Sequence, residues 1–573
     1  MARCGKIVLD WVSKVPGNTS RLEANIVDTG QSRHFLGFAA LAGVVWAASA
    51  AVFFRTSLLS GFDFVPGDRL DARLIIYLHE HLFESLLGNG QFASPRFYYP
   101  QANVLGYSDA FLLDLLPFSA LRLLGFDSYL SFLIMIMTLS ASCFTSVAII
   151  FGKYFRTNVC LALCGAVLIT FPNNLYFKTQ FGHLQFFSLY YIPVIALLVI
   201  WSLESFPRIT PRSIGGTLAA SVLFALLLST GYYTAWMFAL TALLAILFSG
   251  IALRRDVSGF IASNARPLAI LLGTAAAGFI VGLIPFVLIY APVLQIFPSR
   301  PFDEYTLRAP SLRDMINVSA WNSVWGSLID GLLGRARASS PERALAITPG
   351  MTLIFLAFVH AAVRHKLEGG TDSRWTRLFA LCGVSIFVGS WMLTLKIDTI
   401  SAYWIIFHIV PGAGAIRAGD RVQLCVNLWV VSALILMIDR WVASSPTMSR
   451  NRRRFLAGAV LAFCVIEQVN LWSNGLARAT ELAELRAVPA PPRECRSFLV
   501  KYFGEVGEVD AMWISMKTGL PTLNGRSGGA PPGWRLSEPS VDYAAVARQW
   551  IAQNQLSQQV CLYDEVSRRW SFF

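Results

Sequence analysis

The sequence predicts an α-helical protein that crosses a membrane many times. Of its 573 residues, 55% are hydrophobic and only 14% are charged, and the mean hydropathy is +0.55. This composition lies far from that of soluble globular domains. Apolar runs of about 17 to 25 residues, the length that spans a hydrocarbon layer, recur along the chain. We expect about eleven spans, at residues 35–54, 128–151, 158–176, 185–203, 214–231, 234–252, 268–291, 346–363, 378–395, 422–438 and 455–474.

The charges of the connecting segments predict the orientation of these spans. If the leader 1–34 is cytoplasmic, the segments on its side hold 21 Lys/Arg and 8 Asp/Glu, and the rest of the chain holds 26 of each. The whole net charge of +13 then lies on the cytoplasmic side, where positive residues gather in membrane proteins. We therefore expect an inner-membrane protein with a cytoplasmic N-terminus and an extracytoplasmic C-terminus. The first run lacks the cleavage site of a signal peptide, so we expect it to remain as an anchor.

The chain is expected to divide into the leader 1–34, a transmembrane part 35–474 and a C-terminal domain 475–573 on the outer side. The tail is charged and less apolar than the rest, which favours a small domain of α/β character packed on the transmembrane part. Long outer segments in compact membrane proteins are usually functional. We expect three of them, at residues 55–127, 292–345 and 396–421.

The first outer loop, 55–127, is expected to carry two helices that lie on the membrane surface. In residues 70–87 the apolar side chains recur at helical spacing, which predicts an amphipathic helix. Residues 109–125 are apolar but too polar for a confident span, and they predict a second interfacial helix. The polar face of the first helix is expected to carry Arg73, Glu80, His81 and Glu84.

Two carboxylates, Asp68 and Asp71, lie in the stretch GFDFVPGDRLDARL, directly after the first span. One interpretation is structural, with Asp68 as an N-cap and Asp71 as the acid at N3 of the following helix. The other is catalytic. A carboxylate that is partly desolvated at a membrane interface gains proton affinity, and it can act as a general base.

A second group of polar side chains lies at the outer mouth of a span, among aromatic residues. Lys178, Gln180, His183 and Gln185 either belong to an interfacial belt, with a snorkelling lysine, or form a phosphate or sugar site. A polar group so close to an apolar span is costly without a partner. Both interpretations stay open.

Arginines mark two further outer segments. The glycine-rich stretch FHIVPGAGAIRAGDRVQL carries Arg417, Asp420 and Arg421, which suit either a phosphate ligand or a salt-bridged loop. The segment 292–345 adds basic side chains with aromatic neighbours that could close over a substrate. These are Arg300, Arg308 and Arg313.

Other chemistries find no support in the sequence. The nine cysteines show no CxxC or metal-ligand spacing, and six lie in apolar runs, so we interpret them as apolar filler rather than as a disulfide frame or a zinc site. His79 and His81 are two apart on a predicted helix and point about 200° apart, which excludes a shared metal. GxSxG, Walker and GxGxxG motifs are missing, so no acyl-serine or ATP-driven chemistry is predicted.

Five stretches taken together resemble bacterial multispanning glycosyltransferases of the GT-C superfamily, in particular a large and mostly uncharacterised group of them. The resemblance rests on the order of the stretches and their shared outward placement, and it covers about residues 35–535. After the uncleaved first span come GDRLD (67–71), RFYYPQANVLGYSDAFLL (96–113), GHLQ (182–185), VPGAGAIRAGDR (410–421) and LNGRSGGAPPGW (523–534).

The resemblance implies a sugar donor carried on a polyprenyl phosphate and a lipid, glycan or protein acceptor outside the cytoplasm. In GT-C enzymes a carboxylate of the first outer loop deprotonates the acceptor hydroxyl, and Asp68 matches that position best, with Asp71 second. GDRLD is neither the Asp-Glu pair nor the DxD of better-known relatives, so a divalent cation stays open as a cofactor. The residues expected to contact the lipid phosphate or the sugar are Lys178, His183, Gln185, Arg417, Arg421, Tyr99, Asn103 and Asp109.

The main hypothesis is therefore an inverting hexosyl- or pentosyltransferase. Inverting transfer needs one base for the attacking hydroxyl and a stabilised phosphate leaving group, with no covalent enzyme intermediate. One alternative is a transporter or flippase for a lipid-linked glycan, which ionisable residues in mid-span would favour. The other is a catalytically inactive GT-C-like membrane scaffold. The span centres are nearly free of ionisable residues, which favours the enzyme.

Overall fold

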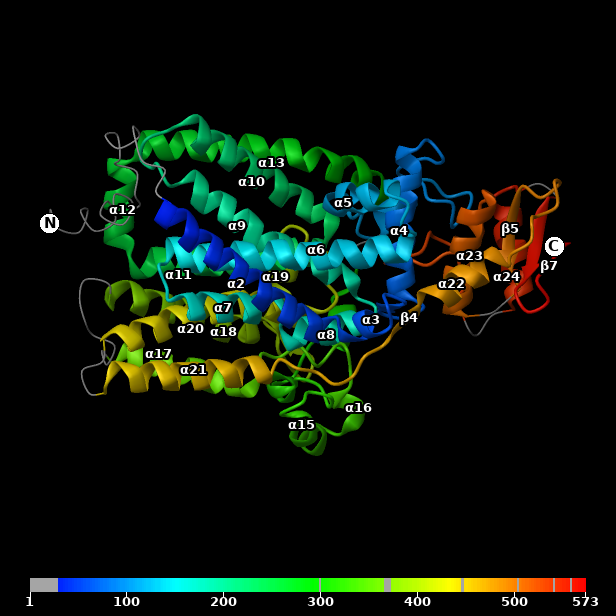
Figure 1. Ribbon diagram of the computed structural model, residues 1–573. Coiled ribbons are helices and arrows are strands. Elements are labelled where there is room, and N and C mark those ends of the chain that lie inside the picture. The colour runs from blue at the N-terminus through cyan, green and yellow to red at the C-terminus, as the bar shows by residue number, and fades with distance from the viewer. Residues whose placement is uncertain are drawn as a thin grey trace.

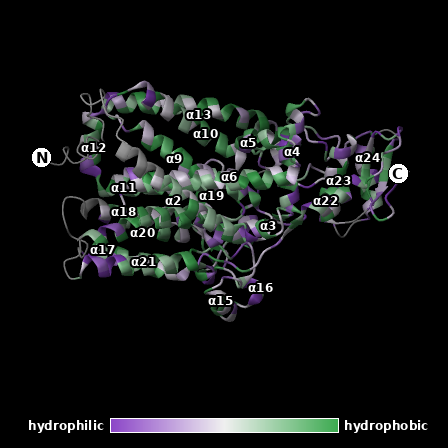
Figure 2. Cartoon of the chain, viewed as in Figure 1, coloured by the Kyte–Doolittle hydropathy of each residue, from purple (hydrophilic) through white to green (hydrophobic). Residues whose placement is uncertain are grey.

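The computed structural model describes residues 29–297, 300–364, 373–444, 448–501, 504–538, 542–556 and 559–573. Long helices run side by side in an elongated bundle, and a small domain that contains the C-terminus lies at one end (Figure 1). We call this the domain end of the bundle. Figure 2 shows hydrophobic residues along most of the bundle helices, with hydrophilic residues gathered near α12 and α17 at the opposite end.

Each of the eleven apolar runs contains a helix. The bundle consists of α2 (Thr29–Phe53), α6 (Ser128–Ile149), α7 (Val159–Thr170), α9 (Tyr191–Ser202), α10 (Pro211–Thr230), α11 (Tyr232–Ala252), α13 (Ala265–Leu294), α17 (Pro349–Val363), α18 (Ser373–Thr394), α20 (Val422–Ser444) and α21 (Arg450–Ile466). Shorter helices extend or join them, namely α8 (Asn173–Gln180), η3 (Leu184–Tyr190) and α12 (Arg254–Ser263).

Within the described residues, eight helical segments are long and apolar enough to cross a membrane. The protein is thus a multi-pass membrane protein, as predicted, but the count of eleven spans is not confirmed. The apolar parts of α2 (Gly37–Phe53) and α17 are shorter than 18 residues. Helix α21 begins with the basic sequence RNRRR, which lowers its hydropathy.

The first outer loop folds as α3 (Arg55–Leu59), β1 (Phe64–Pro66), α4 (Asp71–Leu86), η1 (Val104–Tyr107) and α5 (Leu112–Leu123). The helices predicted over 70–87 and 109–125 are confirmed as α4 and α5. Helix α4 runs across the direction of the bundle, between the bundle and the C-terminal domain (Figure 1).

The polar face of α4 is not exposed, contrary to the prediction. Arg73, Glu80 and His81 are all buried, because the C-terminal domain, α5 and the loop residue Phe92 respectively contact them. The Nε of Arg73 lies 2.8 Å from Glu481 of the C-terminal domain, and Arg122 of α5 donates to Glu80 at 2.7 Å. The charges that the helical pattern placed toward water are therefore paired between elements.

The remaining outer segments are mostly short helices. Residues 300–345 form α14 (Phe302–Arg308), η4 (Leu312–Ile316), α15 (Gly326–Leu333) and α16 (Arg335–Ala338). The segment between α18 and α20 contains β2 (Lys396–Ile397), β3 (Ile400–Ser401), α19 (Tyr403–Ile409), η5 (Ala413–Ala415) and η6 (Gly419–Arg421).

The C-terminal domain has the α/β character that the sequence predicts. It contains β4 (Gly475–Ala477), α22 (Arg478–Arg486), β5 (Ser497–Val500), α23 (Glu505–Thr518), α24 (Tyr543–Gln553), β6 (Val560–Asp564) and β7 (Arg569–Phe572). In its sheet β6 pairs with β5 in parallel and with β7 antiparallel. Strand β4 pairs antiparallel with β1, which ties the start of the domain to the first outer loop.

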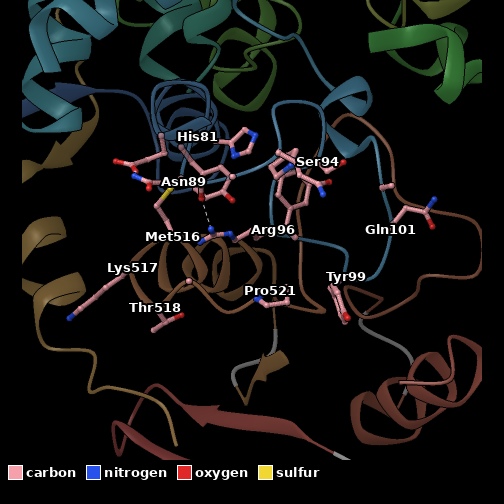
Figure 3. A pocket seen from close by; sticks show the side chains of 18 of the residues that line it. His81, Asn89, Ser94, Arg96, Tyr99, Gln101, Met516, Lys517, Thr518 and Pro521 are labelled. Atoms are coloured by element: carbon pink, nitrogen blue, oxygen red, sulfur yellow. Dashed lines mark hydrogen bonds between the residues drawn. The ribbon is translucent and has the colours of Figure 1, made fainter. Parts of the chain in front are cut away.

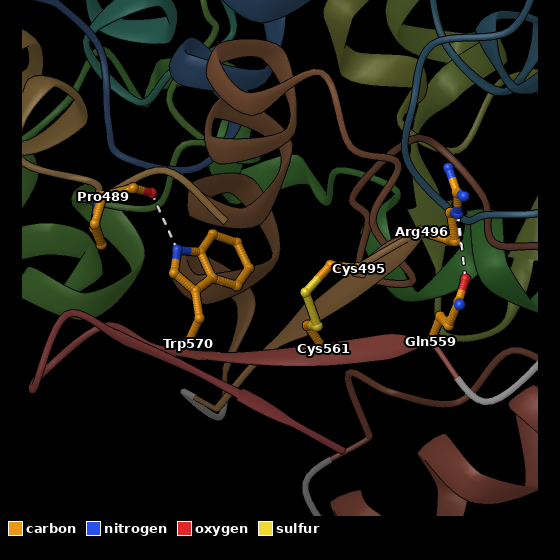
Figure 4. The surroundings of a disulfide bond; sticks show 6 residues. All are labelled: Pro489, Cys495, Arg496, Gln559, Cys561 and Trp570. Carbon is orange, nitrogen blue, oxygen red and sulfur yellow. Dashed lines mark hydrogen bonds between the residues drawn. A yellow bond between two sulfur atoms is a disulfide. The ribbon is translucent and has the colours of Figure 1, made fainter. Parts of the chain in front are cut away.

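The interpretation of every cysteine as apolar filler is wrong for one pair. Cys495, just before β5, forms a disulfide bond with Cys561 of β6 (Figure 4). The two residues are 66 positions apart, and only the parallel pairing of β5 with β6 brings them together. Contacts on either side of the bond join the same segments, with Arg496 donating to Gln559 at 3.2 Å and Trp570 donating to the carbonyl of Pro489 at 3.0 Å.

Candidate active site

Asp68 lies in the turn that leads into α4. Its Oδ1 accepts hydrogen bonds from the backbone N–H groups of Leu70 at 3.2 Å and Ala72 at 3.0 Å. Asp68 therefore accepts hydrogen bonds from free N–H groups at the start of α4, but the predicted N-cap position is wrong, because the N-cap residue is Leu70. Within the described part of the chain, no group donates a hydrogen bond to its Oδ2. One carboxylate oxygen is thus fixed by the backbone.

The carboxylate of Asp68 lies directly against Gly182, the first residue of GHLQ. A Cβ atom at position 182 would come within 2.3 Å of Oδ1 of Asp68, and the φ angle of Gly182 is +88°. This backbone conformation favours glycine. The close approach therefore needs a residue without a side chain, and it brings two stretches of the predicted site into contact.

Asp71 does not act as the N3 acid of a capping box. It is the first residue of α4, and its Oδ1 accepts hydrogen bonds from Nε and Nη2 of Arg526, at 3.2 and 3.0 Å. Its Oδ2 lies 3.6 Å from Nδ1 of His183. Asp71 therefore connects the first outer loop with GHLQ and with the C-terminal domain.

Glu342 is the centre of the charged cluster. Its Oε1 lies 3.6 Å from Nε2 of His183 and accepts a hydrogen bond from Arg421 at 3.1 Å. Its Oε2 lies 3.2 Å from Nζ of Lys178. Lys178, His183 and Arg421, which the sequence placed in two separate candidate sites, thus meet at one carboxylate.

Arg421 and Lys178 are held more tightly than the sequence suggests. The guanidinium of Arg421 lies over the rings of Tyr233 and Phe186, 4.7 and 5.4 Å from their centroids. Lys178 is fully buried and donates to the carbonyl of Pro341 at 2.8 Å. Both cations are therefore enclosed by the protein, and their charges are offset mainly by Glu342.

Burial and neighbouring charges change the proton affinities in this cluster. Burial raises the pKa of Asp68, and the Asp71 carboxylate raises it further, although the N–H of Ala72 lowers it. Burial and the charge of Lys178 lower the pKa of His183 to about 4, so its imidazole is neutral at neutral pH. Burial raises the pKa of Glu342, but Lys178 and Arg421 lower it by more, so Glu342 stays ionised.

A second cluster of arginines surrounds Glu304. Its Oε1 lies 2.9 Å from Arg300, 3.5 Å from Arg308 and 3.7 Å from Arg417. About a third of each arginine side chain is exposed. Three cations therefore share one anion, which leaves a positive surface. Arg313, which the sequence grouped with Arg300 and Arg308, is exposed outside this cluster.

The other predicted substrate contacts are spread over several places. Asp109 accepts from the N–H of Tyr232 at 2.9 Å, and burial raises its pKa to about 6, while the nearby Arg421 lowers it. The buried Oε1 of Gln185 has no hydrogen-bond partner among the described residues. Tyr99 lines a cavity beside α23, and the N–H of Asn103 donates to Ser94 at 3.0 Å. None of the contacts found for Tyr99 and Asn103 reaches Asp68 or Asp71.

Two residues of the cluster were missed at the level of sequence. Glu342 lies in the outer segment 292–345, where the predicted site residues are all arginines. Arg526 lies in LNGRSGGAPPGW, which contributed to the family resemblance but gave no site residue. Among the described residues, no group of three or more His, Cys, Asp or Glu side chains could hold a metal ion.

These features define a multi-pass helical membrane protein whose main charged cluster lies where the bundle meets the C-terminal domain. No protein-family model and no curated protein sequence matches the chain. A comparison with solved structures finds the arabinofuranosyltransferase AftD from mycobacteria, with a TM-score of 0.43 and 14% identity. It covers 81% of this chain and 30% of AftD, so the chain spans about a third of that protein.

A second structural match is ArnT from Cupriavidus metallidurans, determined with bound undecaprenyl phosphate. The TM-score is 0.37 and the identity 11%, and the match covers 86% of this chain and 85% of ArnT. Because both TM-scores are below 0.5, the chemistry of the site rests on the contacts of the chain's own residues.

Proposed function

We propose that this chain is a membrane glycosyltransferase of the GT-C type, which moves a sugar from a polyprenyl-phosphate donor to an extracytoplasmic acceptor. The observation that carries the proposal is the position of Asp68. Its carboxylate has a raised pKa and an oxygen to which no described residue donates, and it lies against Gly182, next to His183 of the charged cluster. The resemblance of GDRLD and the following stretches to GT-C enzymes supports the same assignment.

Asp68 acts as the general base. Because Oδ1 is fixed by two N–H groups, Oδ2 is the oxygen that accepts the proton of the acceptor hydroxyl. The hydroxyl oxygen forms a bond to the anomeric carbon of the donor sugar while the bond from that carbon to the phosphate oxygen breaks. A single displacement of this kind inverts the anomeric configuration.

Asp71 is a positioning residue in this proposal. Its Oδ1 is already engaged by two N–H groups of Arg526 and its Oδ2 lies near His183, so neither oxygen is as open to a substrate as Oδ2 of Asp68. Its negative charge favours the protonated form of Asp68, which contributes to the raised pKa of that residue. A base with a raised pKa removes a proton more effectively from a weakly acidic hydroxyl.

Arg417 is the best candidate for contact with the phosphate leaving group. Arg421 and Lys178 are buried and paired with Glu342, whereas Arg417 shares Glu304 with two other arginines and remains partly exposed. Guanidinium groups bind phosphate oxygens through paired N–H donors. The backbone N–H of Arg417 donates to Tyr233 at 2.8 Å, and Tyr233 also contacts Arg421, so the two clusters are neighbours.

The disulfide supports an extracytoplasmic site. Disulfide bonds persist in oxidising compartments outside the cytoplasm. The C-terminal domain carries the Cys495–Cys561 bond, and Arg526 of the same domain reaches Asp71. The candidate base and the disulfide therefore lie on the same side of the membrane, which agrees with the orientation predicted from the charges.

A flippase is less well supported than a transferase. The ionisable residues Lys178, Asp420 and Arg421 lie at the ends of their apolar segments, Val159–Gln180 and Gly419–Ala443, rather than at mid-span. Substrate pathways through a membrane need polar groups near its middle.

The proposal is tested by comparing the envelope lipids and glycans of a deletion strain by mass spectrometry. Complementation with the wild-type gene should restore a glycosylated product that is lost in the deletion strain, whereas the Asp68→Asn gene should not. Restoration by Asp68→Asn would overturn the assignment of the base. An envelope unchanged by the deletion, together with no transfer in vitro from polyprenyl-phosphate hexoses or pentoses, would overturn the proposed activity.

A further inference from the structure

A cavity of about 930 Å³ lies between the first outer loop and the end of α23 (Figure 3). Its walls come from α4, from the chain between residues 88 and 102, and from residues 516–521. Asp68, Asp71 and the arginines around Glu304 do not belong to its lining. It is therefore a separate feature from the candidate active site. Its volume lies in the upper part of the range of about 300 to 1,000 Å³ that is usual for ligand sites.

The charged side chains that line this cavity are already engaged by the protein. Lys517 donates to the carbonyls of three residues between positions 485 and 488, at 2.7 to 2.8 Å, and in Figure 3 it points away from the other labelled side chains. Arg96 donates to the carbonyl of Asn89, whose side chain donates to Glu84 at 2.6 Å. Burial lowers the pKa of His81 to about 4, which leaves the imidazole neutral.

Neutral polar and aromatic groups remain for a ligand. Gln91 and Gln101 both line the cavity, and no described residue forms a hydrogen bond with either side-chain amide. Tyr99 contributes a partly exposed ring, and Tyr77 and Phe97 form a buried aromatic wall. Amides supply donors and acceptors together, and aromatic rings supply an apolar face. This combination suits a neutral polyhydroxylated ligand better than an anion or a purely apolar molecule.

Helix α4 separates the cavity from the candidate base. It begins at Asp71, and Tyr77, His81 and Glu84 of the same helix line the cavity. At a rise of 1.5 Å per residue, His81 lies about 15 Å along the helix axis from Asp71. Residues 72–83 of α4 are buried, so packed protein lies along the helix between the two places.

We propose that this cavity is a binding site for a neutral oligosaccharide, separate from the candidate active site. The sugars lie between Gln91, Tyr99 and Gln101.

Binding to the full chain in nanodiscs tests the proposal. The probes are neutral glucan, mannan, galactan and arabinan oligosaccharides of one to six units, with phosphorylated and uronic-acid oligosaccharides as charged controls. At least one neutral series should bind, with an affinity that rises with length. In Gln101→Ala and Gln91→Ala the affinity for the longest member should fall by about 3- to 10-fold, the loss expected for one neutral hydrogen bond. Gln549→Ala, an exposed change on α24 outside the cavity, is the matched control and should not alter it.

Two results would overturn the inference. One is that no neutral oligosaccharide binds, or that the charged controls bind more tightly. The other is binding that Gln91→Ala and Gln101→Ala leave unchanged in protein of wild-type thermal stability. Asp68→Asn separates this failure from that of the proposed function, because it should abolish transfer and leave oligosaccharide binding intact. Binding without transfer by the wild type from any polyprenyl-phosphate sugar would count against the enzyme, whereas transfer without length-dependent binding would count against the cavity.

Discussion

Arg526 donates two hydrogen bonds to Oδ1 of Asp71, a residue 455 positions earlier in the chain. Arg526 also lies 2.9 Å from Glu505 at the start of α23, so its guanidinium bridges the C-terminal domain and the first outer loop. The strand pair β1–β4 joins the same two regions. The position of the first outer loop, which carries the candidate base, therefore depends on contacts with the C-terminal domain.

The first prediction concerns the base itself. Asp68→Asn should lower the rate of sugar transfer by about 100- to 10,000-fold, the usual contribution of a general base. The amide oxygen of asparagine can still accept the N–H groups of Leu70 and Ala72, so the start of α4 should be kept. Initial rates with a polyprenyl-phosphate sugar, measured beside the thermal unfolding temperature, check both expectations.

Asp63→Asn is the matched control for Asp68→Asn. Asp63 lies in the same loop, and its Oδ1 accepts the N–H of Ala479 at 2.7 Å, which is a capping contact without a catalytic role. The control should keep the wild-type rate. Equal losses in the two variants would indicate that the loop needs its acids for structure alone.

The second prediction is a change in the pH profile when Arg526 is replaced. Asp68 must be ionised to accept a proton, so kcat/KM falls as the pH drops through its pKa. The charge of Arg526 lowers that pKa, and Arg526→Gln should therefore move the acid limb to higher pH. Arg526→Lys keeps the charge and should restore much of the wild-type limb. A purely structural role would lower kcat/KM at every pH and leave the limb in place.

The bundle could be predicted from the sequence because each span is a local feature. An apolar run of sufficient length forms a helix in a membrane whatever lies far away in the chain. The predicted helices over 70–87 and 109–125 were also encoded locally, by their spacing. The exposure of the polar face of α4 was predicted wrongly, because Arg73 is covered by Glu481 and Asp510 of a domain more than 400 residues later.

The candidate site was only partly predictable for the same reason. Asp68, Lys178 and His183 stood out because they are polar residues close to apolar runs. Glu342 and Arg526 stand in segments with no local pattern, and only tertiary packing brings them to His183 and Asp71. The sequence therefore indicates the cations Lys178 and Arg421, but it does not indicate that Glu342 is the carboxylate that pairs with them.

The third prediction uses the close contact between Gly182 and Asp68. Gly182→Ala should lower transfer by at least about tenfold, because the new Cβ would lie 2.3 Å from Oδ1 of Asp68 and force the carboxylate to move. Gly125→Ala is the control, since Gly125 has a similar φ of +91° and nothing within 4 Å of the added Cβ. Both variants should lose about 1 kcal/mol of stability from the backbone conformation. Only Gly182→Ala should lose activity.

The fourth prediction concerns Glu342 and stability. Glu342→Gln should lower the free energy of unfolding by about 2 to 3 kcal/mol, because it leaves Lys178 and Arg421 close together without their shared anion. Glu538→Gln, which breaks an exposed pair with Arg535, should change the free energy of unfolding little, because solvent screens such pairs. Unfolding in mixed micelles measures both.

The difference in the free energy of unfolding between the wild type and Glu342→Gln should depend on pH, because the pKa of Glu342 is lowered in the folded protein. A carboxylate whose pKa is lowered by folding contributes its stability above its ordinary pKa of 4.5 and loses it as the pH falls toward the folded value. The gap between wild type and Glu342→Gln should therefore be full at neutral pH and shrink below pH 4.5. A gap that is unchanged in acid would show that the loss comes from packing rather than from charge.

The last prediction tests the disulfide and, through it, the side of the membrane on which the site lies. Mass spectrometry of the protein alkylated without reducing agent should find Cys495 and Cys561 unmodified, and reduction should expose both thiols. The double change Cys495→Ser and Cys561→Ser should lower the stability of the C-terminal domain by about 2 to 4 kcal/mol, because the bond closes a loop of 66 residues. Cys160→Ser, at an exposed free cysteine, should have little effect.

Since Arg526 belongs to the destabilised domain, the double variant should also lose transfer activity as the domain unfolds, and lose it at a lower temperature than the wild type. Alkylation of Cys495 and Cys561 in freshly isolated membranes without reduction would place the domain in a reducing compartment and contradict the proposed topology.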